Sequence, residues 1–382
     1  MNIQLLNKIA AVGLDQLDNS YNVGENIENP DGIMVRSAVM HEMEFAPSLK
    51  AIARAGAGVN NIPIERCSEN GIVVFNTPGA NANGVKELAI CALLLAARDV
   101  VGGIAWANTL TEDVAKQVEK GKSKFGGTEL MGKTLGVIGL GAIGGKIANT
   151  AIHLGMNVIG CDPFLSIEGA WNLNHRVNRA ATYDEVFEKA DYITLHVPAT
   201  KETKNMICTE SIAKMKNGVK IINLSRADLV NAEELKAALA DGKVSAYVTD
   251  FPTEEVINTP GVVAIPHLGA STEESEDNCA VMAARQLDDY LKNGNIKNSV
   301  NYPNVEMPRS GVARICVLHQ NIPSILTKIT AAVADEGLNI ENLTNKSKGE
   351  NAYTLLDVSS TPSEDAIARI SAVEGINRVR VI

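Results

Sequence analysis

One short segment constrains this chain more than any other, the run Gly139-Leu140-Gly141-Ala142-Ile143-Gly144, which follows an apolar stretch and opens a helical one. In this context the first glycine permits a tight turn, the second lets the backbone approach a pyrophosphate, and the third allows close packing of helix on strand. The phosphates then lie at the helix N-terminus, where free N–H groups point at an anion. We therefore expect residues 139 to 144 to bind a dinucleotide.

A carboxylate at the appropriate distance strengthens this interpretation. The next apolar run, Met156 to Cys161, predicts a strand that ends at Asp162. An acidic residue about 20 positions beyond the glycine motif holds the ribose 2′-hydroxyl and would repel a 2′-phosphate, so NAD is favoured over NADP. A glycine-rich turn in some other α/β protein is the alternative, and the combination of strand, motif and carboxylate argues against it.

The surrounding pattern predicts a complete nucleotide-binding domain. Six short apolar runs occur at residues 135–139, 156–161, 192–197, 219–224, 244–248 and 262–265, each followed by a helical or loop segment. Strands joined by such crossovers form a Rossmann-type, doubly wound parallel sheet. We assign residues 98–270 to this domain, which begins with a polar helical stretch from Arg98 to Lys124.

Two further regions flank the nucleotide-binding domain. Residues 1–97 alternate short β-branched runs with helical patterns, and together with residues 271–303 they predict a flavodoxin-like α/β substrate domain. A proline and a glycine in residues 304–311 predict a linker. Residues 312–382 follow the order strand, helix, strand, strand, helix, strand, which is the βαββαβ pattern of a ferredoxin-like domain.

Composition excludes several classes of function. A net charge of −10 argues against nucleic acid as a partner, since phosphate binding needs a basic surface. The longest apolar stretch, Leu88 to Ala97, is shorter than the roughly 20 residues of a membrane span, and no basic-then-apolar leader begins the sequence. The six cysteines are scattered singly, which indicates buried thiols. We expect a cytoplasmic protein with no membrane contact and no metal site.

Several segments occur in the order typical of the D-isomer-specific 2-hydroxyacid dehydrogenases, and the sequence resembles that family over nearly the whole chain. They are Arg54 to Asn61, the glycine motif with Asp162, His196-Val197-Pro198, Asn223-Leu224-Ser225-Arg226, Asp250 to Glu254, and Pro266 to Thr272. The resemblance implies an NAD-dependent enzyme acting on a small 2-hydroxy acid. It also implies NAD contacts at Gly139, Gly141, Ala142, Ile143, Gly144, Asp162, His196, Val197, Pro198, Leu224, Ser225, Arg226, Asp250, His267, Gly269 and Ala270.

The resemblance implies a catalytic trio of Arg226, Glu254 and His267, and each residue type suits the chemistry. An arginine fork can hold the substrate carboxylate through paired charge-assisted hydrogen bonds. Histidine titrates near neutrality, so His267 can take the hydroxyl proton as hydride leaves and return it in the reverse reaction. Glu254 would stabilise the imidazolium. The structural alternatives are an ordinary ion pair for Arg226 and Glu254 and a helix-entry position for His267.

The chain departs from the family pattern at two points near the trio. Relatives carry an aspartate at the position of Thr249, where it meets the nicotinamide carboxamide, so either Asp250 takes that role or Thr249 replaces the aspartate. The segment between Glu254 and His267 is shorter than in many members. Glu255 is therefore an alternative partner for the histidine, and we choose Glu254.

The resemblance makes 3-phospho-D-glycerate the leading substrate, and it implies oxidation to 3-phosphohydroxypyruvate, the first step of L-serine biosynthesis. A phosphorylated acid needs a cationic pocket, and Arg36 and Arg54 stand at or just after predicted strand ends. The following loop supplies Gly56, Ala57 and Gly58 as further substrate contacts. Small residues at strand ends are also ordinary turn chemistry, which is the alternative interpretation.

The C-terminal region resembles an ACT regulatory domain. His319 and Asn321 join a predicted strand to a helix, and Asn339 follows that helix, at the spacing where serine-sensing relatives hold their effector. These side chains supply the donors and acceptors that an amino acid needs. Ser324 occupies the position of a glycine in those relatives, so a domain that only dimerises is the alternative. We expect L-serine as effector and a homodimer or homotetramer.

Three rival functions stay open. A hydroxypyruvate or glyoxylate reductase would use the same trio, although the regulatory region argues against it. A non-catalytic NAD-sensing scaffold is disfavoured because all three catalytic residue types are present. The C-terminal domain could also bind an amino acid other than serine.

Overall fold

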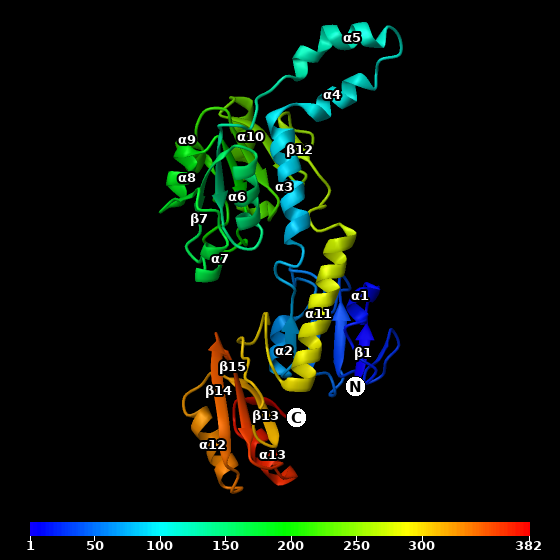
Figure 1. Cartoon of the computed structure of the whole chain (residues 1–382), viewed down its shortest axis with the longest axis vertical. Helices are drawn as coiled ribbons and strands as arrows, with labels where there is room; N and C mark the ends of the chain where they lie inside the picture. The colour runs from blue at the N-terminus through cyan, green and yellow to red at the C-terminus, as the bar shows by residue number, and fades with distance from the viewer. The chain divides into compact units, whose positions relative to one another are not determined.

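The computed structural model describes residues 1–382 and forms two compact units. The terminal unit comprises residues 1–81 and 276–382, and the central unit comprises residues 82–275. Three separate sheets account for all the strands (Figure 1). Each unit is described by itself below.

The central unit contains a seven-stranded parallel sheet with the order β12-β11-β10-β9-β6-β7-β8. Its strands are β6 (Thr134–Ile138), β7 (Asn157–Cys161), β8 (Val177–Arg179), β9 (Tyr192–Leu195), β10 (Val219–Asn223), β11 (Val244–Thr249) and β12 (Val262–Ala264). The order reverses between β6 and β9, as in a Rossmann-type sheet, where ligands bind at the carboxyl ends of the strands. The prediction of a doubly wound sheet is therefore confirmed, and β8 was missed because it is short and largely exposed.

Helices cover both faces of this sheet. The helical elements are α3 (Ala82–Ala97), α4 (Val100–Ala107), α5 (Val114–Gly121), η1 (Lys122–Phe125), α6 (Gly144–His153), α7 (Ile167–Trp171), α8 (Tyr183–Lys189), α9 (Thr209–Lys214), η2 (Ala227–Leu229) and α10 (Ala232–Ala240). Alternate strand residues enter different cores: Val137 packs with α3 and α6, and Ile138 packs with α8. This alternation follows from the two-residue period of a strand.

The stretch from Arg98 to Lys124 differs from the polar helical stretch that was predicted. It contains two helices and a 3₁₀ turn with a break at residues 108–113, and α4 is apolar. Val101 and Ile104 of α4 are exposed. Within the central unit, α4 and α5 project away from the sheet (Figure 1), so this apolar helix contributes little to the core.

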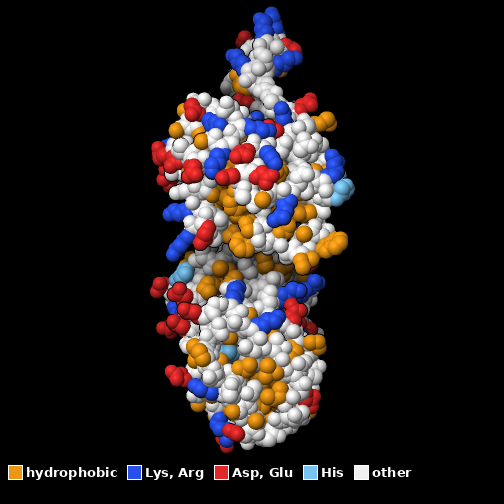
Figure 2. Space-filling model, turned by 90° about the vertical axis from the view of Figure 1, so that its left-hand side faces the viewer, with side chains coloured by type: hydrophobic (Ala, Val, Ile, Leu, Met, Phe, Trp, Pro, Cys, Tyr) orange, Lys and Arg blue, Asp and Glu red, His pale blue; other side chains and the backbone are white.

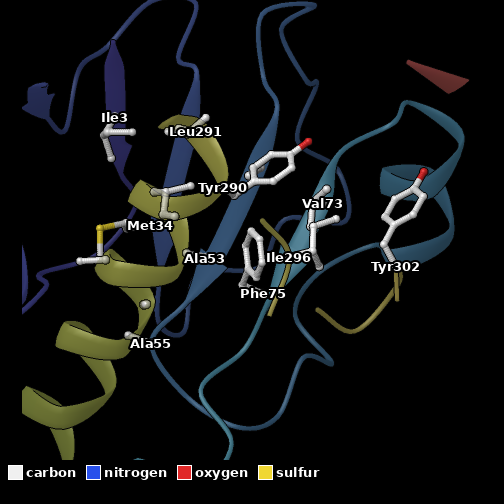
Figure 3. Close-up of a cluster of buried hydrophobic side chains, with 14 of the residues drawn as sticks. Ile3, Met34, Ala53, Ala55, Val73, Phe75, Tyr290, Leu291, Ile296 and Tyr302 are labelled. Carbon is white, nitrogen blue, oxygen red and sulfur yellow. The ribbon is translucent and has the colours of Figure 1, made fainter. Parts of the chain in front are cut away.

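The N-terminal part of the terminal unit is a five-stranded parallel sheet with the order β2-β1-β3-β4-β5. Its strands are β1 (Asn2–Leu5), β2 (Asn22–Gly24), β3 (Gly32–Val35), β4 (Ala51–Arg54) and β5 (Val73–Phe75), with helices α1 (Ala11–Leu14), α2 (Ile64–Glu69) and most of α11 (Glu273–Asn293). This flavodoxin-like order confirms the predicted fold class. Side chains of α11 pack on the sheet, and the rings of Phe75 and Tyr290 lie 5.7 Å apart (Figure 3).

The C-terminal part is an antiparallel sheet with the order β14-β15-β13-β16. Its elements are β13 (Ala313–Gln320), α12 (Ile325–Ala334), β14 (Ile340–Lys348), β15 (Asn351–Val358), α13 (Glu364–Ser371) and β16 (Ile376–Val381), which confirms the ferredoxin-like βαββαβ fold. One sheet face packs against α12 and α13. The other face, which includes Cys316, Leu318 and Tyr353, belongs to the same core as Phe75 and Tyr290.

The structure thus divides the chain differently from the domain boundaries expected above. Helix α3 groups with the central unit, whereas residues 82–97 were expected in the substrate domain, because its buried face packs on α6 and β10. The C-terminal sheet groups with the terminal unit because the two share a hydrophobic core. Residues 304–311 therefore join two parts of one compact unit.

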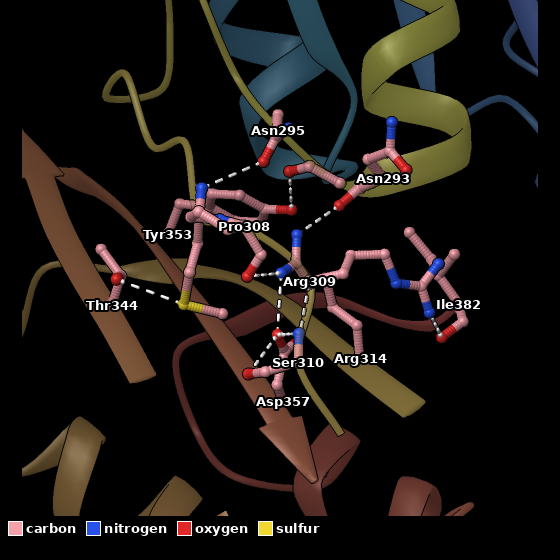
Figure 4. Close-up of polar contacts among 12 residues, drawn as sticks. Asn293, Asn295, Pro308, Arg309, Ser310, Arg314, Thr344, Tyr353, Asp357 and Ile382 are labelled. Carbon is pink, nitrogen blue, oxygen red and sulfur yellow. Dashed lines mark hydrogen bonds and ion pairs between the residues drawn. The ribbon is translucent and has the colours of Figure 1, made fainter. Parts of the chain in front are cut away.

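A buried ion pair reinforces this junction (Figure 4). Arg314 of β13 contacts both carboxylate oxygens of Asp357 of β15, at 2.6 and 2.8 Å, and both side chains are fully buried. The same guanidinium donates to the carbonyl oxygens of Asn293, at the end of α11, and Pro308. The backbone N–H of Ser310 donates to Asp357 at 2.7 Å. Arg314 therefore ties the C-terminal sheet to α11 and to the connecting segment.

Two surface properties complete the description. On the face drawn in Figure 2, acidic and basic side chains are interspersed without a continuous basic band. No single helix has both the length and the hydropathy to cross a membrane; α3 and α4 meet those criteria only as a pair that is bent by 72°.

Candidate active site

The glycine motif forms the turn between β6 and α6. Gly139 has φ = +87°, and a Cβ there would collide with the carbonyl oxygen of His196. A Cβ at Gly144 would collide with the carbonyl oxygen of Gly139, whereas a Cβ at Gly141 would meet no atom within 4 Å. The fold itself therefore requires the first and third glycines, and the second borders open space. This arrangement fits a dinucleotide, whose pyrophosphate approaches the backbone at the second glycine.

Asp162 follows β7 and lies against the glycine turn. One carboxylate oxygen accepts the N–H of Leu140 at 2.9 Å, and the other accepts the N–H of Phe164 at 2.9 Å. A carboxylate has about four acceptor positions, so capacity for a ribose hydroxyl remains. The position and chemistry of Asp162 fit the predicted role.

The segments after β9 and β10 stand at the same carboxyl edge of the sheet. His196 Nε2 lies 2.8 Å from the hydroxyl of Thr194, and burial lowers the pKa of His196 to about 3, so the ring is neutral. The hydroxyl of Ser225 donates to the carbonyl oxygen of Leu195 at 2.6 Å, which ties the two segments together. Val197, Pro198 and Leu224 complete these segments.

A buried polar network fixes the backbone of Arg226. The side-chain amide of Asn223, at the end of β10, donates to the carbonyl oxygen of Arg226 at 2.8 Å and to the hydroxyl of Tyr247 at 3.1 Å. The Arg226 side chain is exposed, with its guanidinium carbon 5.5 Å from the centre of the Phe251 ring. The guanidinium donates to the carbonyl oxygen of Ser225 at 2.6 Å, and its exposed side chain is open to a ligand.

His267 contacts the same aromatic ring. The rings of Phe251 and His267 have centroids 4.4 Å apart, and the His267 side chain is exposed. The Phe251 ring therefore lies next to both the predicted carboxylate-binding arginine and the predicted acid–base histidine. The structure brings Arg226 and His267 together within the central unit.

Glu254 is not brought into this cluster. It is exposed and makes no hydrogen bond or ion pair with His267. Glu255 is also exposed, and a hydrogen bond from Thr253 lowers the pKa of its carboxyl. Neither of the two glutamates considered from the sequence contacts the histidine here.

Asp250 is the carboxyl group that does lie beside the cluster. It is 1% exposed, its Oδ2 accepts the N–H of Gly269 at 3.1 Å, and its Oδ1 has no hydrogen-bond partner. Burial raises the pKa of Asp250, against the opposing effects of the Gly269 bond and the charges of His267 and Arg226. Thr249 is fully buried, and its hydroxyl accepts the N–H of Phe251 at 3.0 Å.

The predicted phosphate-binding arginines lie together in the terminal unit. Arg54 ends β4 and its Nε donates to the carbonyl oxygen of Arg36, which follows β3, at 3.0 Å. Arg36 also forms a 2.6 Å ion pair with Glu276, which the sequence did not indicate. A Cβ at Gly56 would crowd the Arg54 guanidinium, so glycine lets that side chain lie against the loop that continues to Ala57 and Gly58.

Comparisons with known proteins agree with this geometry. The pattern of the family "D-isomer specific 2-hydroxyacid dehydrogenase, NAD binding domain" matches residues 94–269. A D-3-phosphoglycerate dehydrogenase of Haemophilus influenzae is 31% identical over 92% of this chain and 86% of its own length. The chain belongs to the D-isomer-specific 2-hydroxyacid dehydrogenase family. Its central unit is the NAD-binding domain of that family, and NAD is the cofactor.

Two further relatives extend the comparison. A D-3-phosphoglycerate dehydrogenase of Methanocaldococcus jannaschii is 36% identical over 82% of this chain, which spans only 59% of that relative. The crystal structure of NAD⁺-bound 3-phosphoglycerate dehydrogenase from Entamoeba histolytica is 32% identical, with a TM-score of 0.62, and covers 79% of this chain and 98% of that one.

The predicted effector residues do not converge within one chain of this family member. His319 is buried, and its Nε2 forms a 2.8 Å hydrogen bond with the hydroxyl of Thr354. The side-chain amide of Asn321 donates to the carbonyl oxygen of Gly349 at 3.2 Å. Asn339 lies at the opposite end of the sheet, where its carbonyl oxygen accepts the N–H of Ser359. Ser324 has φ = +64°, a conformation that favours glycine.

Sequence reasoning missed the supporting residues of the active site. From the sequence, Phe251 had no predicted role beyond its place in the segment from Asp250 to Glu254. The buried hydrogen bond between Asn223 and Tyr247 was also not predicted. The available signal was the polar side chain of Asn223 directly after the apolar pair Ile221 and Ile222, because a buried amide must find partners.

Proposed function

We propose that this protein is a D-3-phosphoglycerate dehydrogenase, which oxidises 3-phospho-D-glycerate to 3-phosphohydroxypyruvate in the first step of L-serine biosynthesis. The observation that carries the proposal is the placement of Arg226 and His267 on the Phe251 ring, at the carboxyl edge of the NAD-binding sheet. A carboxylate-binding cation next to an acid–base group is the arrangement that a 2-hydroxy acid requires. The names of the relatives support the choice of substrate.

The chemistry follows from the side chains. Arg226 binds the substrate carboxylate and orients the neighbouring carbon. His267 removes the hydroxyl proton, the O–H electrons form the carbonyl, and the C–H bond breaks with its electron pair. NAD, when bound, accepts that pair with the hydrogen as hydride. In the reverse direction His267 returns the proton. The sequence-based role of Glu254, support of the imidazolium, stays a prediction, since the two side chains make no contact here.

The NAD contacts inferred from the family resemblance are also proposals for the individual residues. Between Thr249 and Asp250, we propose Asp250 as the partner of the nicotinamide carboxamide. The Thr249 hydroxyl already accepts an N–H, whereas Asp250 Oδ1 has no partner.

We propose Arg36 and Arg54 as the phosphate-binding residues. They stand at the carboxyl ends of adjacent parallel strands, and the guanidinium fork matches phosphate geometry. We expect Arg54→Ala to raise the KM for 3-phospho-D-glycerate roughly 10- to 100-fold, the equivalent of a charged hydrogen bond of about 1.5–3 kcal/mol. The KM for unphosphorylated D-glycerate serves as the internal control and changes little.

The rate of NADH formation with 3-phospho-D-glycerate and with D-glycerate tests the assignment. A strong preference for the phosphorylated acid supports it. An equal or reversed preference would assign the enzyme to the hydroxypyruvate or glyoxylate reductases instead. Absence of turnover with every 2-hydroxy acid, together with intact NADH binding, would favour a non-catalytic NAD-sensing protein.

We propose further that the enzyme is a cytoplasmic homodimer or homotetramer with L-serine as its effector. Asn321 and Asn339 lie at opposite ends of the same sheet, so a shared effector site would need a second copy of the domain. The exposed apolar side chains of Val101 and Ile104 also favour self-association. Light scattering gives the oligomer size, and calorimetry across the amino acids tests serine against other effectors.

A further inference from the structure

The central sheet has a small cavity at its amino edge, where β6, β9 and β10 begin. Arg226 and His267 lie at the carboxyl edge of the same sheet, so no step of the proposed reaction uses this cavity. Its volume is about 150 Å³. Pockets for drug-sized ligands measure roughly 300–1,000 Å³, so this one suits a much smaller molecule.

Three lysines and a single carboxylate line the cavity. The cations are Lys133, Lys216 and Lys220, and the carboxylate is that of Asp191. One oxygen of Asp191 accepts the N–H of Thr134 at 2.8 Å, and the other forms a 2.9 Å ion pair with Lys216. Asp191 therefore neutralises one of the three lysines, and Lys133 and Lys220 have no ion-pair partner.

Lys220 occupies an unusual position for a lysine. It is the second residue of β10, which lies between β9 and β11, and it shares a sheet face with the buried residues Tyr192 and Ile222. Lysine is rarely placed in such surroundings without a partner. The ammonium group of Lys220 lies 5.1 Å from the centre of the Tyr192 ring and makes no hydrogen bond. Burial and the nearby charge of Lys133 lower the pKa of Lys220, against the opposing effect of Asp191.

The two lysines without ion pairs form an arrangement that an anion would complete. Their like charges repel each other, and a phosphate between them would accept charge-assisted hydrogen bonds from both. Gly218, which also lines the cavity, borders open space, since a Cβ there would meet no atom within 4 Å. A small ligand can therefore approach on that side.

We propose that this cavity binds a phosphate group, as free phosphate or as a small phosphate ester, through Lys133 and Lys220. The proposal does not depend on the substrate assigned above. A phosphate bound here would connect the segment before β6 to β10. It would also stabilise the central unit, because a ligand that binds only the folded state adds to its stability.

The test is hydrogen exchange followed by mass spectrometry on the full chain, titrated with inorganic phosphate at constant ionic strength. Arg54→Ala serves as the background, because it removes the proposed phosphate contact of the substrate. We expect phosphate to protect residues 128–134 and 216–220. Adding Lys220→Met, which keeps an apolar stem against Tyr192 but removes the charge, should raise the Kd about 10-fold or more.

Two further variants separate the site from folding and from general charge effects. Lys133 is exposed, so Lys133→Gln should fold normally and weaken phosphate binding to a similar extent. Lys236 of α10 is ion-paired with Glu233 and lies outside the cavity, so Lys236→Gln should change the Kd by less than about twofold.

The same experiment with 3-phospho-D-glycerate distinguishes the two sources of phosphate. Protection of residues 216–220 by both compounds would extend the site to phosphate esters, and protection by inorganic phosphate alone would restrict it to the free ion; either result supports the site. The proposal would be overturned by absence of protection with both compounds. It would also be overturned by an unchanged Kd in Lys133→Gln and Lys220→Met, or by an equal loss of binding in Lys236→Gln.

Discussion

Two buried aspartates, one in each unit, show how differently this protein treats a buried charge. Asp357 is fully buried in the terminal unit, and both its oxygens contact Arg314. Burial alone would raise the pKa of Asp357, but hydrogen bonds from Arg314 and Ser310 outweigh burial and lower it. Asp250 is buried to the same degree in the central unit, yet one of its oxygens is unpaired and its pKa is raised.

The difference separates a structural charge from a functional one. A carboxylate whose acceptors are filled has nothing further to bind, and Asp357 joins the C-terminal sheet to α11 through Arg314. An incompletely satisfied carboxylate next to a histidine and an arginine costs stability and is retained where chemistry needs it.

The largest expected effect comes from breaking the satisfied pair. We expect Arg314→Ala to destabilise the terminal unit by about 3–5 kcal/mol, because it leaves a buried carboxylate without its cation. Hydrogen exchange followed by mass spectrometry should show the loss in β13 and β15. The double variant Arg314→Met with Asp357→Leu is the control, since it removes both charges. A loss in the double variant as large as in Arg314→Ala would mean that packing, not charge, holds the junction.

A smaller effect is expected from acid. The pKa of Asp357 is lowered in the folded state, so its contribution to stability is present above the unfolded value of 3.8 and is lost as the pH falls through the lower folded pKa. Asp250 has the opposite sign, since a raised pKa makes stability fall as the pH rises from 3.8 through the folded value. Denaturant unfolding of wild type, Asp357→Asn and Asp250→Asn between pH 3 and 7 measures how the free energy of unfolding that each aspartate contributes changes with pH. If both contributions changed with pH in the same direction, the contrast between the two aspartates would be refuted.

The same asparagine substitution in the active site should stabilise the fold. We expect Asp250→Asn to raise the stability of the central unit by roughly 1 kcal/mol at neutral pH, the ordinary size of a single-residue effect. Hydrogen exchange of the buried strands β6, β10 and β11, which belong to the central unit, reports its unfolding. A clear destabilisation would place Asp250 with Asp357 among the structural charges.

The smallest effect is expected from an exposed pair. Lys189 and Glu185 of α8 lie 2.7 Å apart, with the lysine 57% exposed. Lys189→Ala should lower the free energy of unfolding far less than Arg314→Ala does, and salt should diminish even that small loss. A cost near that of Arg314→Ala would show that burial is not what distinguishes these ion pairs.

The sequence predicted the parts of the fold that depend on local pattern. The glycine turn was predicted in place because its backbone requirements are local, as the positive φ of Gly139 illustrates. The C-terminal fold followed from the alternation of its strands and helices, whereas its packing onto the N-terminal sheet did not. A signal existed in β13, where every residue from Ala313 to His319 is buried, since a strand covered on both faces loses its alternation.

The active site was predictable to the same extent. Arg226 and His267 follow apolar strands, so the parallel sheet places them at one edge. The loop from Asp250 to His267 has no regular alternation of apolar and polar residues from which its conformation could be predicted. That conformation decides which carboxylate lies beside the histidine. The exposure of Glu254 and the burial of Asp250 therefore could not be read from residue type alone.

The most direct test of the account is the initial rate of NADH formation from 3-phospho-D-glycerate and NAD by the wild-type protein and by His267→Gln. We expect turnover in the wild type and a loss of about 10²- to 10⁴-fold in the variant, with NADH binding retained. A variant as active as the wild type would contradict the assignment of the proton transfer to His267, and a wild type without activity on this acid would contradict the proposed substrate.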